Sequence, residues 1–294
     1  MIIDFRVRLP LRDSASDPRL KLEDVYTNPE DMARYQDIYG LEEIINTTCD
    51  DLLAEMDEAG VGKAVIHAEY ECGGYKTYHA LNERVAKIVA KYPDRFVGIT
   101  GVDPRDGMVA VRELDWAVKE LGFKGLNLQV PFQGLSAVDR RCYPLYAKCV
   151  ELGIPVAIHV GVHFDTAYAI TQNNPVFLDE IACDFPELKI VGLHGGWPWV
   201  LELIAVARRH PNVYLEYGAV APRYLAMPRA GWEPIMQFGN SLLQDQVLFG
   251  TDWPSLHLKR AMTEFKELTL KEEVKDKILS KNAIQLLGLS WADA

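Results

Sequence analysis

Three side chains suited to acid–base chemistry follow short apolar runs in the sequence. His159 and His194 stand at the ends of two such runs, and Asp252 follows the run 247–249 in a turn that contains Pro254. A buried carboxylate needs a cation or a hydrogen-bond donor as its partner. We therefore take Asp252, His194 and His159 as candidate catalytic residues. The alternative for Asp252 is a plain cap on a helix that starts near Ser255.

Four further residues are candidates for binding a substrate. Arg6 and Arg8 lie two positions apart in a run of strand type, so both side chains should point to the same face. A guanidinium group can hold a carboxylate through two hydrogen bonds, and it offers Asp252 a partner. His67 and Asn127 stand at other predicted strand ends and complete the substrate-binding set. A buried polar residue with satisfied hydrogen bonds is the alternative for His67.

Other polar residues near predicted strand ends have less certain assignments. Gln129 ends the fourth predicted strand, and Glu216 and Tyr217 end the seventh. Neighbouring strand residues point to opposite faces, so only Glu216 or Tyr217 can face the interior, and the sequence does not say which. His163 and His257 are loop candidates for substrate contact.

These residues must be positioned by a repeated unit of one strand and one helix. The predicted strands are Ile2–Arg8, Lys63–His67, Phe96–Thr100, Phe123–Gln129, Pro155–Val160, Lys189–His194, Val213–Tyr217 and Val247–Phe249. Strict alternation predicts parallel strands, and eight units predict an α/β fold of the (β/α)8 TIM-barrel type, as one domain over residues 1–294. The candidates then meet at the C-terminal ends of the strands. An open doubly wound sheet is the alternative, but no Gly-rich fingerprint follows the first strand.

Helical patterns fill the spaces between these strands. The predicted helices are 52–59 behind the caps 47–51, then Tyr78–Tyr92, Met108–Leu121, Asp139–Leu152, Val176–Phe185, Val200–Arg209 and Trp232–Leu243. A long insertion runs from Leu9 to about Asn46 after the first strand, and insertions of that length are usually covers or binding loops. This insertion and the loops around His163 and 222–229 should set the choice of substrate.

Composition limits the possible partners. Lys and Arg number 31 and Asp and Glu 42, so the formal charge of −11 opposes binding to nucleic acid or to an anionic membrane surface. A small carboxylate substrate must be attracted by local positive charge. The five cysteines include no CxxC pair, which argues against disulfides and a thiolate zinc site. With no apolar run of about 18 residues, we expect a soluble, cytoplasmic protein.

Several motifs resemble the amidohydrolase superfamily. They are Ile3-Asp4, His159-Val160-Gly161, His194-Gly195-Gly196 and Gly250-Thr251-Asp252-Trp253-Pro254. The similar branch contains aminocarboxymuconate-semialdehyde decarboxylase, γ-resorcylate and related benzoate decarboxylases, and pyrone-dicarboxylate lactonase. The resemblance implies a divalent metal such as zinc, with His159 and Asp252 as ligands and His194 as the acid/base. It also implies a homodimer or homotetramer, for which Trp197, Trp199 and Trp232 could supply the interface.

The first strand departs from the family pattern. Arg6 and Arg8 stand where metal-dependent members have two histidine ligands. Arginine stays protonated and offers no lone pair, so His159 and Asp252 alone are too few for a catalytic metal. We therefore expect no metal or other cofactor; a metal that did bind would use His159, Asp252 and His194. The two guanidinium groups can replace the electrostatic contribution of the metal.

The expected activity is that of a hydrolase acting on a small carboxylated lactone or cyclic or aromatic acid. In this hypothesis Asp252 is the general base, His194 the acid/base and His159 its orienting partner. Non-oxidative decarboxylation of an aromatic or unsaturated acid is the first alternative. A non-catalytic ligand-binding barrel, in which Arg6 and Arg8 only neutralise acidic neighbours, is the second.

Overall fold

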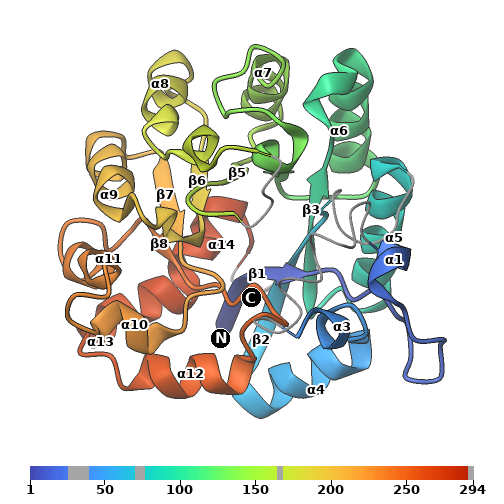
Figure 1. The fold of residues 1–294 in the computed structure, drawn as a ribbon, viewed down its shortest axis with the longest axis horizontal. Coiled ribbons are helices and arrows are strands. Elements are labelled where there is room, and N and C mark those ends of the chain that lie inside the picture. Colours follow the sequence, from blue (N-terminus) through green and yellow to red (C-terminus); the bar gives the residue numbers. More distant parts are fainter. Residues whose placement is uncertain (26–39, 70–76, 164–167, 291–294) are drawn as a thin grey trace.

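The structure, a computed structural model, describes residues 1–25, 40–69, 77–163 and 168–290. Eight parallel strands follow one another around a single sheet in chain order. They are β1 (Ile2–Arg8), β2 (Val61–His67), β3 (Phe96–Gly101), β4 (Leu126–Leu128), β5 (Val156–His159), β6 (Ile190–Leu193), β7 (Val213–Glu216) and β8 (Val247–Leu248). Figure 1 shows helices placed around the strands, which confirms the predicted TIM barrel.

Backbone hydrogen bonds join the first strand to the segment that contains and follows the last one. Phe5 N donates to Phe249 O at 2.9 Å, and Arg8 N donates to Trp253 O at 2.9 Å. Between them, Asp252 N donates to Arg6 O at 2.9 Å. The sheet is therefore a nearly closed barrel, and the open doubly wound alternative is wrong.

The helices that alternate with the strands carry ordinary start and stop signals. They include α4 (Cys49–Ala59), α5 (Tyr78–Lys91), α6 (Met108–Glu120), α7 (Tyr143–Leu152), α8 (Phe177–Asp184), α9 (Val200–Arg209), α11 (Glu233–Gly239) and α12 (Leu258–Lys266). In α4, Thr48 and Asp51 form a reciprocal capping box, and Gly60 ends the helix with φ 74°. Shorter helices are α1 (Leu22–Val25), α3 (Leu41–Ile44), α10 (Pro222–Ala226), α13 (Glu272–Asp276) and α14 (Asn282–Leu287), with a π-helix over Lys277–Lys281.

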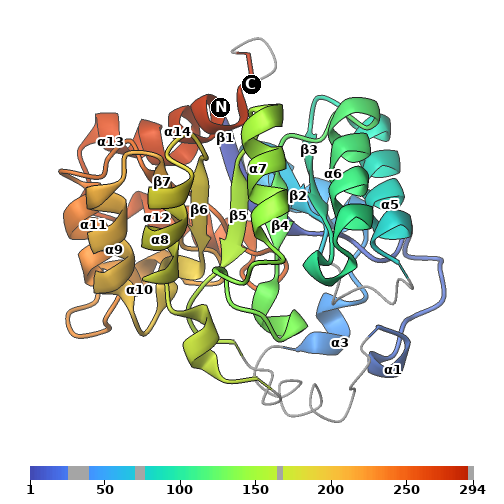
Figure 2. The ribbon, with the colours of Figure 1, turned by 90° about the horizontal axis from the view of Figure 1, so that it is seen from above.

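Two apolar cores stabilise the barrel. The inner core contains strand residues such as Phe5, Val97 and Val191, and Ile284 and Leu287 of α14 pack against it. Figure 2 places α14 near the start of β1, so this helix covers the N-terminal end of the barrel. The larger core lies between the strands and the surrounding helices. The opposite end of the barrel is thus left for polar residues.

Some predicted boundaries are wrong for local reasons. β4 has three residues, not seven: it begins at Leu126, and it ends at Leu128 because Gln129 is the N-cap of a short 3-10 helix over Val130–Gln133. α7 starts at Tyr143, since the Asp139 carboxylate accepts from Arg141 N and holds the preceding residues in a turn. α11 ends at Gly239, not at Leu243.

The described parts of the predicted insertion are tied together at the C-terminal end of the barrel. Asn46 accepts from Leu20 N at 2.8 Å and donates to Leu20 O at 2.9 Å, which joins the beginning and end of the insertion. Figure 2 shows α1 and α3 at this end. The rest of the insertion, residues 26–39, lies outside the described residues. Across the described ranges, no helix is both long and apolar enough to cross a bilayer.

Candidate active site

The predicted site residues come together where the strands end. His67, His159 and Glu216 are the last residues of β2, β5 and β7. His194 follows β6 directly, and Asp252 follows β8 by four positions. Both His194 and Asp252 have a left-handed backbone, with φ of 60° and 56°, which is uncommon for residues other than glycine. Backbone strain of this kind clusters at functional sites.

Asp252 is bound by both arginines of the first strand. Its Oδ1 accepts from Arg6 Nε at 3.0 Å, and its Oδ2 accepts from Arg8 Nη2 at 2.9 Å and Nε at 3.2 Å. Ser255 Oγ adds a fourth donor at 3.2 Å. Burial raises the pKa of Asp252, but the positive charges of Arg8 and Arg6 outweigh it and hold the pKa below its ordinary value. Asp252 is therefore an anion, and the helix-cap alternative is wrong, because His257 is the N-cap of α12.

Arg6 is the central cation of the site, with 1% of its surface exposed. Besides Asp252, its guanidinium donates through Nη2 to Glu69 Oε1 and lies 3.3 Å through Nη1 from His67 Nδ1. Burial lowers the pKa of Arg6, yet the charges of Glu69 and Asp252 raise it overall. The sequence reasoning missed Glu69, which lies two residues beyond the end of β2.

His67 and Asn127 form hydrogen bonds with other protein groups around Arg6. His67 Nε2 donates to Phe5 O at 2.9 Å, so Nδ1 accepts from Arg6. Burial, aided by Arg6, lowers the pKa of His67 to about 3, so the ring is neutral at pH 7. Asn127 donates to Ala68 O at 3.1 Å and accepts from Gln129 at 3.3 Å. Both predicted substrate contacts are thus already hydrogen-bonded to protein.

His194 presents one nitrogen as a base. Its Nδ1 lies 3.0 Å from Gly218 O and must carry the proton, which leaves the lone pair on Nε2. Burial and the charge of Arg6 lower the pKa of His194 to about 4, so the ring is neutral at pH 7. His159 packs beside it, with ring centroids 4.7 Å apart. Burial and His194 lower the pKa of His159 as well.

Phe132 lies between the site and the loop that follows β5. Its ring meets His159 edge-on at 5.3 Å and His163 at 5.6 Å between centroids. His163 is buried, whereas His257 is exposed and pairs with Glu55 at 2.9 Å. The structure thus brings His163, and not His257, against a neighbour of the site histidines.

The choice between Glu216 and Tyr217 is settled by their neighbours. Glu216 accepts from the backbone N–H groups of His194 and Gly218, and it lies in the field of Arg6. Tyr217 belongs to the larger core between the strands and the surrounding helices and packs there against Phe249, with ring centroids 6.2 Å apart. Burial raises the pKa of Glu216 to about 8, so this carboxyl group is largely protonated at pH 7. A Cβ at Gly250 would come within 2.0 Å of Glu216 Oε1, so Gly250 has no room for a side chain.

The residues at the barrel mouth do not fit a divalent metal. A catalytic metal needs about three protein ligands, and both oxygens of Asp252 already accept from guanidinium groups. Within the described ranges, one group of three or more His, Cys, Asp or Glu has its ligand atoms within 4.8 Å of one another, and it lies on α8 and directly after α9. That group contains neither His159 nor His194.

Two of the aromatic residues expected at a subunit interface stack on each other. The rings of Trp197 and Trp232 lie 6.2 Å apart at 22°. Trp197 is 39% exposed, so this pair reaches the surface. A role in a homodimer or homotetramer stays a prediction.

Comparison with known proteins finds a matching family model and several relatives with named activities. The amidohydrolase family model matches residues 14–289. The 2-keto-4-carboxy-3-hexenedioate hydratase of Sphingobium sp. is 33% identical over 135 residues, which is 40% of this chain and 40% of the hydratase. The 2-amino-3-carboxymuconate-6-semialdehyde decarboxylase of Dictyostelium discoideum is 24% identical over 71% of this chain and 66% of its own. The chain thus spans less than two thirds of the length of these relatives.

Solved structures agree with the barrel architecture. An uncharacterised TIM-barrel protein from Bordetella bronchiseptica has a TM-score of 0.78 and 32% identity over 98% of each chain. A 5-carboxyvanillate decarboxylase from Novosphingobium aromaticivorans has a TM-score of 0.73 and 18% identity over 98% of this chain and 96% of its own. That decarboxylase was solved with manganese and a nitrobenzoic acid. The expectation that no metal takes part gains no support from this neighbour.

Proposed function

Because the chain belongs to the amidohydrolase family, we propose that it is a non-oxidative decarboxylase of a small enolic or ortho-hydroxy aromatic carboxylic acid. The observation that carries the proposal is the pair of guanidinium groups on Asp252 together with the unprotonated Nε2 of His194. Relatives that are decarboxylases of small carboxylic acids favour this reaction over the hydrolysis of a lactone. The decarboxylase alternative of the sequence analysis thus replaces the hydrolase hypothesis.

Arg8 is the residue that we expect to receive the substrate. Its side chain is 28% exposed, whereas Arg6 is enclosed by Asp252, Glu69 and His67. Asp252 is an anion that accepts from both arginines, so it has no proton to give and its oxygens are engaged. This favours a positioning role for Asp252 in place of the general base that we expected. It fixes the Arg8 guanidinium where an oxyanion of the substrate can bind.

His194 then moves one proton within the substrate. Its Nε2 accepts the proton of the hydroxyl group beside the carboxylate and returns it to the carbon that bears the carboxylate. The resulting β-keto acid loses carbon dioxide when the bond between that carbon and the carboxyl carbon breaks. The electron pair of this bond forms an enolate or phenolate, which Arg8 stabilises until the oxygen takes a proton from water. His159 packs against His194 and keeps its ring in place.

We further propose that the reaction needs no divalent metal. The guanidinium groups lie where a metal would meet Asp252, and they supply positive charge without ligands that must lose a proton. The 5-carboxyvanillate decarboxylase was solved with manganese, but its sequence is 18% identical to this one, so its metal does not carry over to this site.

Hydration of an unsaturated carboxylate is a second candidate. The hydratase from Sphingobium sp. is 33% identical over the matched 135 residues and favours it. In that reaction Arg8 would hold the carboxylate and the neutral His194 would take a proton from water. No carbon dioxide would form, so one measurement separates the two reactions.

The test is a panel of enolic, ortho-hydroxy aromatic and unsaturated carboxylic acids together with carboxylated lactones, incubated with protein dialysed against a chelator. Released carbon dioxide and the mass of the product are measured with and without added manganese. We expect loss of carbon dioxide from at least one acid without manganese. Gain of one water by an unsaturated acid would favour the hydratase, and gain of one water by a lactone, through ring opening, the hydrolase. Binding without any chemical change across the panel would favour the non-catalytic barrel.

Variants then assign the reaction to this site. Arg8→Met and His194→Asn should abolish most of the turnover. Arg141→Met is a matched control, since Arg141 forms an exposed pair with Asp139 at 2.7 Å. Equal losses in Arg8→Met and Arg141→Met would refute the assignment. Dependence of the wild-type rate on added manganese would refute the metal-free part alone.

A further inference from the structure

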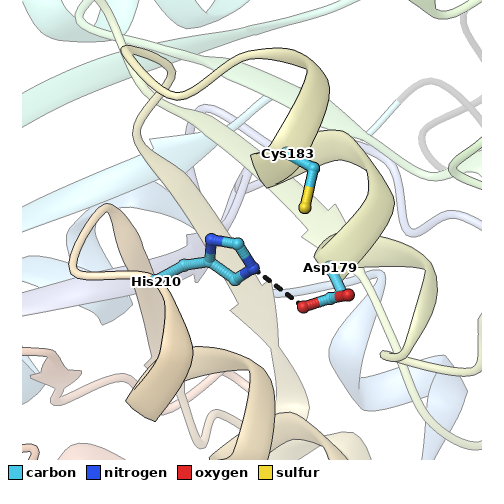
Figure 3. Close-up of side chains that lie close together, drawn as sticks. All are labelled: Asp179, Cys183 and His210. Atoms are coloured by element: carbon cyan, nitrogen blue, oxygen red, sulfur yellow. Dashed lines mark hydrogen bonds and ion pairs between the residues drawn. The ribbon is translucent and has the colours of Figure 1, made fainter.

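Three metal-binding side chains that the proposed function does not use meet on the outer layer of the barrel. Asp179 and Cys183 lie four residues apart on α8, and His210 directly follows α9 (Figure 3). One ligand atom from each lies within 4.8 Å of those of the other two. His210 Nε2 is 2.8 Å from Asp179 Oδ1.

We propose that Asp179, Cys183 and His210 form a zinc site. A thiolate, an imidazole and a carboxylate are the three ligand types that zinc takes in proteins. Bond lengths of about 2.0 to 2.3 Å to a tetrahedral ion place neighbouring ligand atoms roughly 3.5 Å apart. Small side-chain rotations on the helix surfaces reach that separation, and water takes the fourth position. The absence of a CxxC pair argued against a site built from thiolates, but this site needs only one.

The present partners of these residues do not prevent binding. Arg209 Nη1 contacts both oxygens of Asp179, at 2.8 and 3.1 Å, but its side chain is 63% exposed and such surface pairs contribute little. Cys183 is exposed, so an ion can reach the thiol from solvent. The His210 side chain is 13% exposed, so its position is largely fixed by the protein. This partly fixed imidazole favours binding over a random surface cluster.

Zinc at this position would join two neighbouring helices of the outer layer. α8 precedes β6 and α9 follows it, so the ion would link the two helices that flank this strand in the chain. Because metal-binding free energy adds to folding free energy, zinc should raise the thermal stability of the full chain. The inference is independent of the proposed decarboxylation.

Cobalt(II) is the probe, because its thiolate complex absorbs in the near ultraviolet and its tetrahedral form in the visible. The full-length protein is freed of metal and titrated with cobalt, then with zinc. We expect both bands to appear at one equivalent and to disappear as zinc replaces cobalt. Among the cysteines of the described ranges, Cys49, Cys142 and Cys149 are buried, and burial raises the pKa of each thiol, to about 11 for Cys49 and about 12 for Cys142. Cys183 is exposed and is therefore the cysteine that we expect to bind cobalt.

Variants separate this site from any other. Cys183→Ser should remove the thiolate band, and His210→Gln should weaken cobalt binding by about tenfold or more. His257→Gln is the matched control, since His257 is an exposed histidine paired with the single carboxylate of Glu55. A band that persists in Cys183→Ser, or equal binding by His210→Gln and His257→Gln, would overturn the proposal. So would a melting temperature that zinc leaves unchanged in the wild type.

Discussion

Replacing Arg8 by methionine tests the central reasoning about the barrel mouth. Arg8 supplies two of the four hydrogen bonds to Asp252, from Nη2 at 2.9 Å and Nε at 3.2 Å. Arg6 and Ser255 remain, so the buried carboxylate keeps a charged partner. We therefore expect a loss of about 3 kcal/mol in the free energy of unfolding, since two bonds to a charged group are lost at about 1.5 kcal/mol each.

Turnover should also fall, by an amount that the loss of stability does not explain as long as the variant stays folded. If Arg8 binds the oxyanion that forms as carbon dioxide leaves, its removal costs roughly 10²- to 10³-fold in kcat. The charge of Arg8 also helps to lower the pKa of His194, although burial and Arg6 act more strongly. In Arg8→Met this pKa rises, and the acid side of the kcat/KM profile should move to higher pH. This shift follows from the charge of Arg8 whether or not Arg8 contacts the substrate, so the fall in kcat is the readout of the proposed contact.

The assay is the release of carbon dioxide across a range of pH, with unfolding by urea measured on the same samples. Arg8→Lys keeps the charge but loses the fork that holds Asp252, so its acid limb should stay near that of the wild type while its rate falls. Unchanged kcat/KM in Arg8→Met, together with reduced stability, would show that Arg8 only neutralises Asp252. The proposed substrate contact would then be wrong.

Three further predictions concern the neighbours of Arg8. His194→Asn should lower kcat/KM about 10²- to 10⁴-fold at neutral pH. Wild-type kcat/KM should fall as the pH drops through about 4, where His194 takes up a proton. A level profile in that range would argue against His194 as the base. Glu69→Gln should lower the free energy of unfolding, measured in urea, by about 3 to 5 kcal/mol, because buried Arg6 loses a carboxylate partner. A loss under about 1 kcal/mol, as expected for a surface pair, would contradict this. The raised pKa of Glu216 contributes stability that is fully present below about pH 4.5 and is lost as the pH rises through about 8. The free energy of unfolding in urea should therefore fall less over that interval in Glu216→Gln than in the wild type. Parallel plots of this free energy against pH would exclude Glu216 as the cause.

The barrel and the main partners of the site could be predicted because both depend on local patterns. Alternating strand and helix patterns fix the parallel order, and the strand ends then place His159, His194 and Asp252 at one end. Two-residue periodicity put Arg6 and Arg8 on one face, and both bind Asp252.

Other features depend on contacts that no local pattern contains. Glu69 lies beyond the last strand residue, where side-chain direction follows the loop and not the pleat. Glu216 and Tyr217 are both buried, so hydrophobicity does not separate them; only the backbone donors around Glu216 do. The four-residue spacing of Asp179 and Cys183 is readable, but their meeting with His210 requires the packing of α8 beside α9.

The ion pair between Arg6 and Asp252 joins residues 246 positions apart. During synthesis, Arg6 leaves the ribosome 246 residues before its carboxylate partner Asp252. The site therefore cannot assemble piece by piece, and such long-range closure slows folding and prolongs the exposure of unfinished sheet edges. A chain released before β8 would leave Arg6 with Glu69 and His67 but without Asp252, so a protein that acts on its substrate is one whose barrel has been completed.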